Sequence, residues 1–138
     1  MSFSATTYNA IKIKSLIETL FQNVSELNLI IDNDGIKSFP ISSHSTEFYV
    51  NRPAGLFDEY SFTFPFNKSI ILVRYILKAL KYVKNKTTVR FSMTQPYTLE
   101  VTITHLDNIN FTTIITTQDA QITDKDAQIT EEKYYILL

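Results

Sequence analysis

The sequence of 138 residues contains no cysteine, no tryptophan and only two glycines. The lack of cysteine excludes disulfide bonds, thiolate metal ligands and a cysteine nucleophile. Two glycines are too few for a glycine-rich loop that cradles phosphates. No apolar run approaches the roughly 20 residues that span a bilayer, and residues 1–10 lack the basic and then apolar layout of a signal peptide. We therefore expect a soluble intracellular protein.

Candidate catalytic groups are also scarce. The two histidines, His44 and His105, lie far apart in the sequence, and neither has a second ligand at metal-binding spacing. The serines beside His44 have no evident carboxylate partner, and adjacent side chains in an extended segment point apart. The acidic pairs at 58–59 and 131–132 are typical of solvated loops. The sequence therefore predicts a protein that is not an enzyme and that uses no metal or cofactor.

The residues that are present indicate a folded chain. Apolar residues make up 44% of the sequence and charged residues 20%, which is typical of a globular domain with its own core. Apolar residues recur every three or four positions in 8–24 and 69–83, which predicts two helices. Alternating and β-branched residues predict strands, with a turn at 32-DNDG-35. The expected strands are 27–31, 36–39, 46–50, 60–66, 87–93, 98–103, 111–117 and 134–138.

The order of these elements predicts an α+β fold in which two helices pack on antiparallel sheets. We expect residues 1–117 to form a single domain, 118–133 a polar connector and 134–138 a terminal strand. The connector contains DAQIT twice, at 119–123 and 126–130. Two copies with one apolar position each are too few for a coiled coil, so the repeat is interpreted as a loop.

The positive charges are unevenly distributed along the chain. No acidic residue lies between Glu59 and Glu100, yet seven of the thirteen basic residues do: Lys68, Arg74, Lys78, Lys81, Lys84, Lys86 and Arg90. On the expected second helix, Arg74, Lys78 and Lys81 fall within about 60° of one another at 100° per residue. A row of lysines is often only a solvated surface, but such a surface usually mixes both signs of charge. The lack of acids favours a polyanion, either nucleic acid or, less readily, an anionic membrane.

Three segments follow one another in an order known from one protein family. They are 16-LIETLFQNVSELNLIIDNDGIKSF-39, 41-ISSHSTEFYVNR-52 and 78-KALKYVKNKTTVRFSMTQPYTLEVTI-103. The first contains a helix, a strand, a turn with glycine and a second strand, and the third contains a Lys-x-Leu-Lys helix and a Thr-x-Arg strand. Together they resemble the N-terminal domain of the DNA sliding clamps of the proliferating cell nuclear antigen family. The resemblance runs along nearly the whole chain with almost no insertions.

The resemblance implies a DNA-clamp domain whose two helices face a central hole. In such a clamp, lysine and arginine hold the phosphate backbone loosely and read no sequence, so the clamp can slide. Lys78 and Lys81 match cations of the second inner helix, and Lys14 matches one of the first. Arg74 and Lys12 extend the same row in this sequence, and Lys68 and Lys84 extend the positive charge at the two ends of the second helix. The expected DNA-binding residues are therefore Lys12, Lys14, Lys68, Arg74, Lys78, Lys81 and Lys84.

Two further sites are implied by the resemblance alone. Family members recruit polymerases and repair factors through short peptides, and the matching pocket residues are Ile41, His44, Ala127, Ile129 and Tyr134. The connector 126-DAQITEE-132 departs from the family pattern because it lacks the usual leucine and proline. Family rings close by pairing edge strands of neighbouring subunits, here 46–50 with 111–117. The implied interface residues are Thr46, Phe48, Val50, Phe111, Thr113 and Ile115.

The number of domains leaves three interpretations open. Clamps of the eukaryotic type have two such domains in each chain, whereas this sequence has one domain, a connector and one strand. Six copies could form a homo-oligomeric ring that serves a DNA polymerase or other replication proteins. The chain could instead be a divergent, for instance viral, scaffold subunit of a replication or transcription complex that binds proteins without encircling DNA. It could also be a piece of a longer clamp. The expected location is the nucleus or a viral replication site, or otherwise the cytoplasm.

Overall fold

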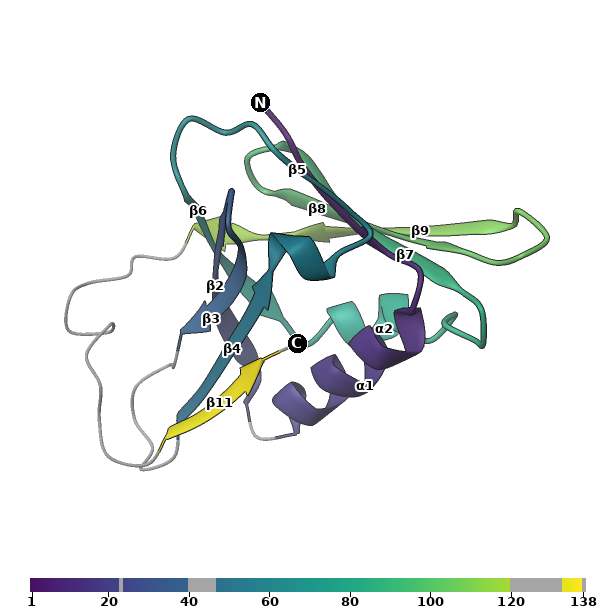
Figure 1. Cartoon of the computed structure of the whole chain (residues 1–138), viewed down its shortest axis with the longest axis horizontal. Helices are drawn as coiled ribbons and strands as arrows, with labels where there is room; N and C mark the ends of the chain where they lie inside the picture. The colour runs from purple at the N-terminus through teal and green to yellow at the C-terminus, as the bar shows by residue number, and fades with distance from the viewer. Residues whose placement is uncertain (23, 40–46, 120–132, 138) are drawn as a thin grey trace.

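The computed structural model describes residues 1–22, 24–39, 47–119 and 133–137, which form two β-sheets, two α-helices and a short 3₁₀-helix, η1 (Ala54–Leu56) (Figure 1). The helices are α1 (Ala10–Phe21) and α2 (Ile76–Leu80), and Figure 1 shows them side by side between the two sheets. This arrangement confirms the predicted α+β class. No helix in these residues is long and apolar enough to cross a membrane.

The first sheet has five antiparallel strands. In spatial order they are β5 (Glu59–Phe62), β1 (Phe3–Thr7), β7 (Thr88–Gln95), β8 (Thr98–Thr104) and β9 (Asn110–Thr116). Leu99, Val101 and Ile103 alternate along β8 and are buried, as expected for a strand with one face on the core. Strand β1 was not predicted, because its sequence FSATT contains a single large apolar residue and no repeating pattern.

The second sheet has six strands. In spatial order they are β10 (Gln118–Asp119), β6 (Lys68–Val73), β2 (Glu26–Asp32), β3 (Gly35–Phe39), β4 (Glu47–Pro53) and β11 (Lys133–Leu137). Neighbouring strands run antiparallel except for β11, which lies parallel to β4. The expected connector at 118–133 therefore begins and ends in strand residues. Strand β4 is not an edge, contrary to the expectation for 46–50, because β11 occupies its outer side.

The prediction of a second helix at 69–83 is largely wrong. Residues Lys68–Val73 form strand β6, and the α-helix that follows is limited to Ile76–Leu80. The run 70-IILV-73 favours a strand, because its branched side chains pack well on a pleated surface. Ile70 and Leu72 are buried and alternate with less buried neighbours, and β6 pairs with β2 along its full length. Pairing between strands distant in sequence therefore overrides the helical spacing.

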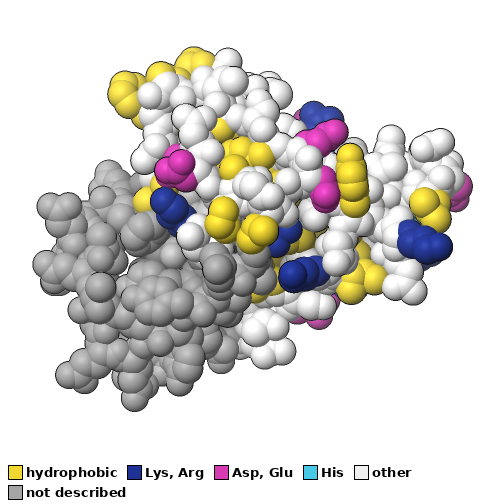
Figure 2. All heavy atoms as spheres, in the orientation of Figure 1, with side chains coloured by type: hydrophobic (Ala, Val, Ile, Leu, Met, Phe, Trp, Pro, Cys, Tyr) yellow, Lys and Arg dark blue, Asp and Glu magenta, His cyan; other side chains and the backbone are white. Residues whose placement is uncertain are grey.

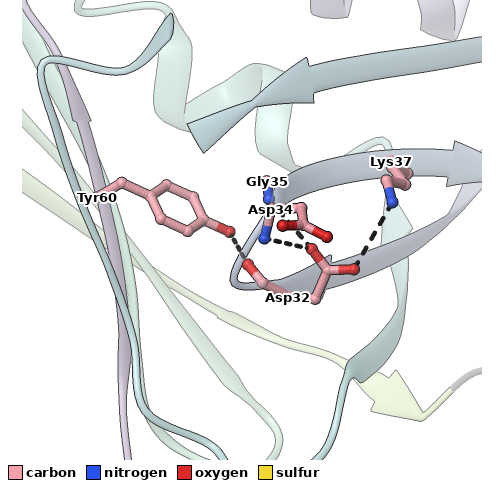
Figure 3. A network of polar contacts seen from close by, with 5 residues as sticks. All are labelled: Asp32, Asp34, Gly35, Lys37 and Tyr60. Carbon is pink, nitrogen blue, oxygen red and sulfur yellow. Dashed lines mark hydrogen bonds and ion pairs between the residues drawn. The ribbon is translucent and has the colours of Figure 1, made fainter. Parts of the chain in front are cut away.

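The predicted turn between β2 and β3 is confirmed. Asp32 accepts hydrogen bonds from the backbone N–H groups of Asp34 at 2.8 Å and Gly35 at 3.1 Å. Gly35 has φ +139°, and a β-carbon there would collide with the backbone carbonyl oxygen of Arg52. Only glycine fits this position without strain. Figure 3 shows Tyr60 reaching the same turn, where its hydroxyl donates to the backbone oxygen of Asp32 at 2.6 Å.

Candidate nucleic-acid interface

Helix α1 forms because its apolar residues lie on one side. Ile13, Ile17 and Leu20 are at most 8% exposed, whereas Lys12 on the opposite side is exposed. The spacing of three and four residues places these apolar side chains in one stripe against the core. The first predicted helix is therefore confirmed, and its polar side faces away from the sheets.

Both ends of α1 are tied to residues that flank α2. The backbone N–H of Ala10 donates to the carbonyl oxygen of Thr87 at 3.2 Å. At the other end, the guanidinium of Arg74 donates to the backbone oxygens of Phe21 and Val24, the second at 2.9 Å. These contacts tie α1 to the segments before and after α2, and the two helices also contact each other directly.

Two lysines of the α2 region lie close to tyrosine side chains. Lys78 and Lys81 are exposed, and each ammonium group lies over a tyrosine ring. The nitrogen of Lys78 is 5.5 Å from the ring centroid of Tyr75, and that of Lys81 is 5.0 Å from the ring centroid of Tyr82. Cation–π contacts at exposed sites are weak, on the order of 0.5–1 kcal/mol, but they restrict where the ammonium group points. The tyrosines were not predicted as part of the site, although Tyr75 precedes Lys78 at helical spacing.

Helix α1 and the loop after α2 supply further cations. Lys12 and Lys84 are exposed, whereas Lys14 forms an ion pair with Glu18 at 4.0 Å. Within the described parts of the chain, Lys12, Lys78, Lys81 and Lys84 take part in no ion pair. In Figure 2 the Lys and Arg side chains on this side of the molecule appear as a few separate groups, some of them beside acidic side chains. We call the surface formed by Lys12, Lys14, Lys78, Lys81 and Lys84 the basic helix face.

Arg74 does not belong to the basic helix face. It precedes α2 rather than lying on it, and its guanidinium group donates to the backbone oxygens of Phe21, the last residue of α1, and of Val24 beyond the helix. The last carbonyl groups of a helix carry partial negative charge and lack partners within the helix. The structure therefore gives Arg74 a role in joining α1 to β6.

Lys68 also lies elsewhere. It begins strand β6, while α2 follows the other end of that strand. Its ammonium group is 2.8 Å from a carboxylate oxygen of Asp119 on β10 and 5.2 Å from the ring centroid of Tyr97. These contacts attach β10 to the sheet, so we do not include Lys68 in the candidate interface.

His105 makes a contact inside the domain. Its Nε2 atom lies 2.7 Å from the backbone oxygen of Tyr82, and its ring packs at 53° against Phe111. Phe111 in turn stacks on Tyr82 at 4.2 Å between ring centroids. No group of three or more possible metal ligands is found among the described residues.

The structure describes the implied peptide pocket only in part. Ile41, His44, Ala127 and Ile129 lie outside the described residues, while Tyr134 lies in β11 opposite Phe48 of β4. This pocket therefore stays a prediction.

The implied subunit interface is described more fully. Thr46 lies outside the described residues, Phe48 and Val50 lie in β4, and Phe111, Thr113 and Ile115 lie in β9. Ile115 is 5% exposed because it faces the core. The groups that β9 offers at its edge are therefore backbone N–H and C=O groups, while the side chain of Ile115 points into the core.

An apolar cavity of about 100 Å³ lies between α1 and the sheets. Its lining contains one charged residue, Arg52, which is 8% exposed. The guanidinium donates to the backbone oxygen of Leu56 at 2.9 Å and lies 4.8 Å from the ring centroid of Phe57. Burial lowers the pKa of Arg52, and the nearby carboxylate of Asp58 partly opposes this shift. The cavity is part of the core and separate from the basic helix face.

Comparison with known proteins shows the fold. Protein-family models and curated proteins yield no match to the sequence. Among solved structures, the chain is similar to the PCNA of Thermococcus kodakaraensis, with a TM-score of 0.78 and 24% sequence identity. The similarity covers 88% of this chain and 48% of that one, so the chain spans about half the length of this relative. The chain therefore has the fold of one clamp domain of PCNA.

Proposed function

We propose that this protein is a sliding-clamp subunit that tethers replication proteins to double-stranded DNA. The proposal assigns no catalytic role to the chain. DNA would contact the basic helix face through its phosphates, and several copies would together form an oligomeric ring. A DNA polymerase or another replication or transcription protein would be the partner held on DNA. The PCNA-like fold and the charge of the helices support this function together.

The observation that carries the proposal is the basic helix face itself. Lys12, Lys78, Lys81 and Lys84 have no ion-pair partner among the described residues, although the chain carries a net charge of −1. Unpaired cations repel one another, and the negative charge of a bound polyanion relieves that repulsion. Binding also releases counterions from the polyanion, which favours the complex. Ammonium groups that bind phosphates without reaching base edges fit a protein that moves along DNA.

Charge reversal on α2 tests this function. We expect Lys78→Glu with Lys81→Glu to weaken binding to double-stranded DNA at least about tenfold at low salt. The slope of log K against log salt should also fall by about two per chain, because two phosphate contacts are lost. Fluorescence anisotropy with a labelled duplex, measured over a series of salt concentrations, provides both quantities.

Arg90→Glu, which reverses one charge rather than two, is the control. Arg90 is exposed on β7 between the buried residues Val89 and Phe91, so its side chain lies on the sheet face opposite the core and the helices. We expect this variant to keep the DNA affinity and the salt slope of the wild type. Equal loss in both variants would mean that only net charge matters, and no loss in either would reject DNA binding by the basic helix face.

A second candidate function is a clamp-fold scaffold that binds proteins without encircling DNA. It is favoured by the pairing of β11 with β4, because a ring closed through the outer edge of β4 needs that edge free. A scaffold makes no use of the basic helix face. Under this alternative, the double charge reversal leaves the assembly and partner binding of the protein unchanged.

A further inference from the structure

We propose that Tyr75, directly before α2, stacks on an unpaired base, so that the basic helix face binds single-stranded DNA as well as duplex DNA. The inference deepens the proposed function and rests on it, because the lysines beside Tyr75 would hold the phosphates. It adds a second form of DNA as a ligand and names the side chain that would distinguish the two forms.

The first supporting observation is the exposure of the Tyr75 ring. Tyr75 is 65% exposed, while Ile76 next to it is buried in the core. Within the described residues, Tyr75 stacks on no other aromatic ring. Tyr82 differs in this respect, because its ring stacks on Phe111 at 4.2 Å between centroids. A single exposed aromatic residue is common on protein surfaces, so the surroundings of Tyr75 decide what it can bind.

The second observation is the positive charge beside the ring. The ammonium group of Lys78 lies 5.5 Å from the ring centroid of Tyr75, and Lys81 follows three residues later. Neither lysine takes part in an ion pair within the described parts of the chain. No acidic residue lies between Glu59 and Glu100 in the sequence. A phosphate group can therefore approach the ring without repulsion from a carboxylate of this segment.

The backbone holds Tyr75 in place on both sides. Its carbonyl oxygen accepts a hydrogen bond from the N–H of Lys78 at 3.0 Å, and the N–H of Arg74 donates to the backbone oxygen of Ser25 at 3.2 Å. A tyrosine side chain has only two rotatable χ angles, so little conformational freedom is lost when it makes a contact. The ring is therefore well placed to stack on a ligand.

An aromatic ring beside unpaired cations is typical of sites that bind single strands. The cations bind the phosphates, and the ring stacks on a base whatever its identity, because every base has a π face. Base pairs inside a duplex cover one another's faces, so duplex DNA would meet the lysines and not the ring. The site would favour no sequence, but it would bind unpaired DNA by one contact that duplex DNA cannot make.

Two oligonucleotides of equal length test this contact in the full-length chain. One consists of thymidines, and the other has the same phosphates but abasic sugars in place of the nucleosides. We expect the protein to bind the thymidine oligonucleotide at least about fivefold more tightly at low salt, as one stacked base accounts for. Fluorescence anisotropy of the labelled oligonucleotides measures both affinities.

Substitutions of Tyr75 identify the ring as the cause. Tyr75→Ala and Tyr75→Leu should bind both oligonucleotides as the wild type binds the abasic one, whereas Tyr75→Phe should keep the preference for thymidine. Tyr8→Ala is the control. Tyr8 is also exposed, but it precedes α1, and its backbone N–H donates to the carboxylate of Asp58 at 2.6 Å. This variant should keep the preference in full.

Two results would overturn the proposal. The first is a wild-type protein that binds both oligonucleotides equally or binds neither. The second is a preference for thymidine that persists in both Tyr75→Ala and Tyr75→Leu.

The oligonucleotides also separate this inference from the proposed function. If the preference depends on Tyr75 but the protein is not retained on circular duplex DNA, the stacking site stands and the DNA clamp is rejected. If the protein is retained on circular DNA but shows no preference for thymidine over abasic sugars, the clamp stands and the stacking site is rejected.

Discussion

Tyr60 shows how one hydroxyl group connects two parts of the domain. It lies on β5 of the first sheet, and it donates a hydrogen bond to the backbone oxygen of Asp32 in the turn of the second sheet (Figure 3). Burial of the phenol raises its pKa above the ordinary value of 10.0, and the nearby charges of Asp32 and Asp34 raise it further. Ionisation of Tyr60 would place a further negative charge at a half-buried position near Asp32 and Asp34.

This shift in pKa predicts a loss of stability at alkaline pH. Tyr60 in the unfolded chain releases its proton near pH 10, whereas the folded protein holds it to a higher pH. Titration of Tyr60 therefore leaves the free energy of unfolding unchanged below about pH 9 and lowers it as the pH rises through 10 and beyond. Urea unfolding at pH 8 and at pH 10.5 measures the difference.

Substitution of the hydroxyl isolates its contribution. Tyr60→Phe should unfold more easily at pH 8 by about 1 kcal/mol, because the bond to Asp32 is lost, and it should lose less stability between pH 8 and pH 10.5 than the wild type. Tyr8→Phe is the control, since Tyr8 is 58% exposed. Equal alkaline losses in the wild type and Tyr60→Phe would contradict the assignment.

At the scale of elements, Arg74 joins α1 to β6. The helix ends at Phe21, whose carbonyl group lies beyond the last regular hydrogen bond of the helix. Arg74 supplies donors to two backbone oxygens in this region and brings positive charge to the negative end of the helix dipole. Its position was predicted to be on the DNA-binding row, but these contacts give it a structural role.

We predict that Arg74→Ala lowers the free energy of unfolding by about 1–3 kcal/mol, since two charge-assisted hydrogen bonds are lost. Arg74→Lys should recover only part of this loss, because one ammonium group does not reproduce the fork of the guanidinium. Chemical unfolding measures each variant, and Arg90→Ala, at an exposed position, should stay within about 0.5 kcal/mol of the wild type. If Arg74→Ala instead weakens DNA binding at unchanged stability, Arg74 contacts phosphate after all.

At the scale of the whole molecule, the proposed function requires assembly around DNA. One chain has a mass of 15.9 kDa and spans about half of the PCNA chain to which it is similar, so several copies are needed to enclose a duplex. We expect a mass several times that of one chain in light scattering at high protein concentration. Protein bound to nicked circular DNA should stay bound through gel filtration at moderate salt.

Linearising the circle provides the decisive comparison. A ring that encircles DNA slides off free ends, so cutting the circle should release the protein without any change in its affinity for phosphate. The variant Lys78→Glu with Lys81→Glu should assemble normally but should not be retained. Protein that stays monomeric at every concentration and is indifferent to DNA would reject the clamp and leave the scaffold function.

Much of the fold could be predicted because local patterns determine it. The stripe of Ile13, Ile17 and Leu20 makes α1 amphipathic whatever it packs against, and Asp32 with Gly35 encodes a turn within four residues. The alternation in β8 likewise identifies a strand with one buried face. These features depend on neighbours a few residues away, so they can be recognised in a single sequence. The lysines of the basic helix face could be found in the same way, as cations opposite an apolar stripe.

What the sequence by itself determined is therefore the class of fold, most of the strands and the charge of the surface. Only the tertiary structure decided that Lys68–Val73 is a strand on β2, that Arg74 binds the end of α1, that Lys68 pairs with Asp119, and that β11 occupies the edge of β4. Each of these depends on a partner that lies 37 to 86 residues away along the chain. Short-range spacing carries no information about such partners, because the chain brings them together only when the two sheets form.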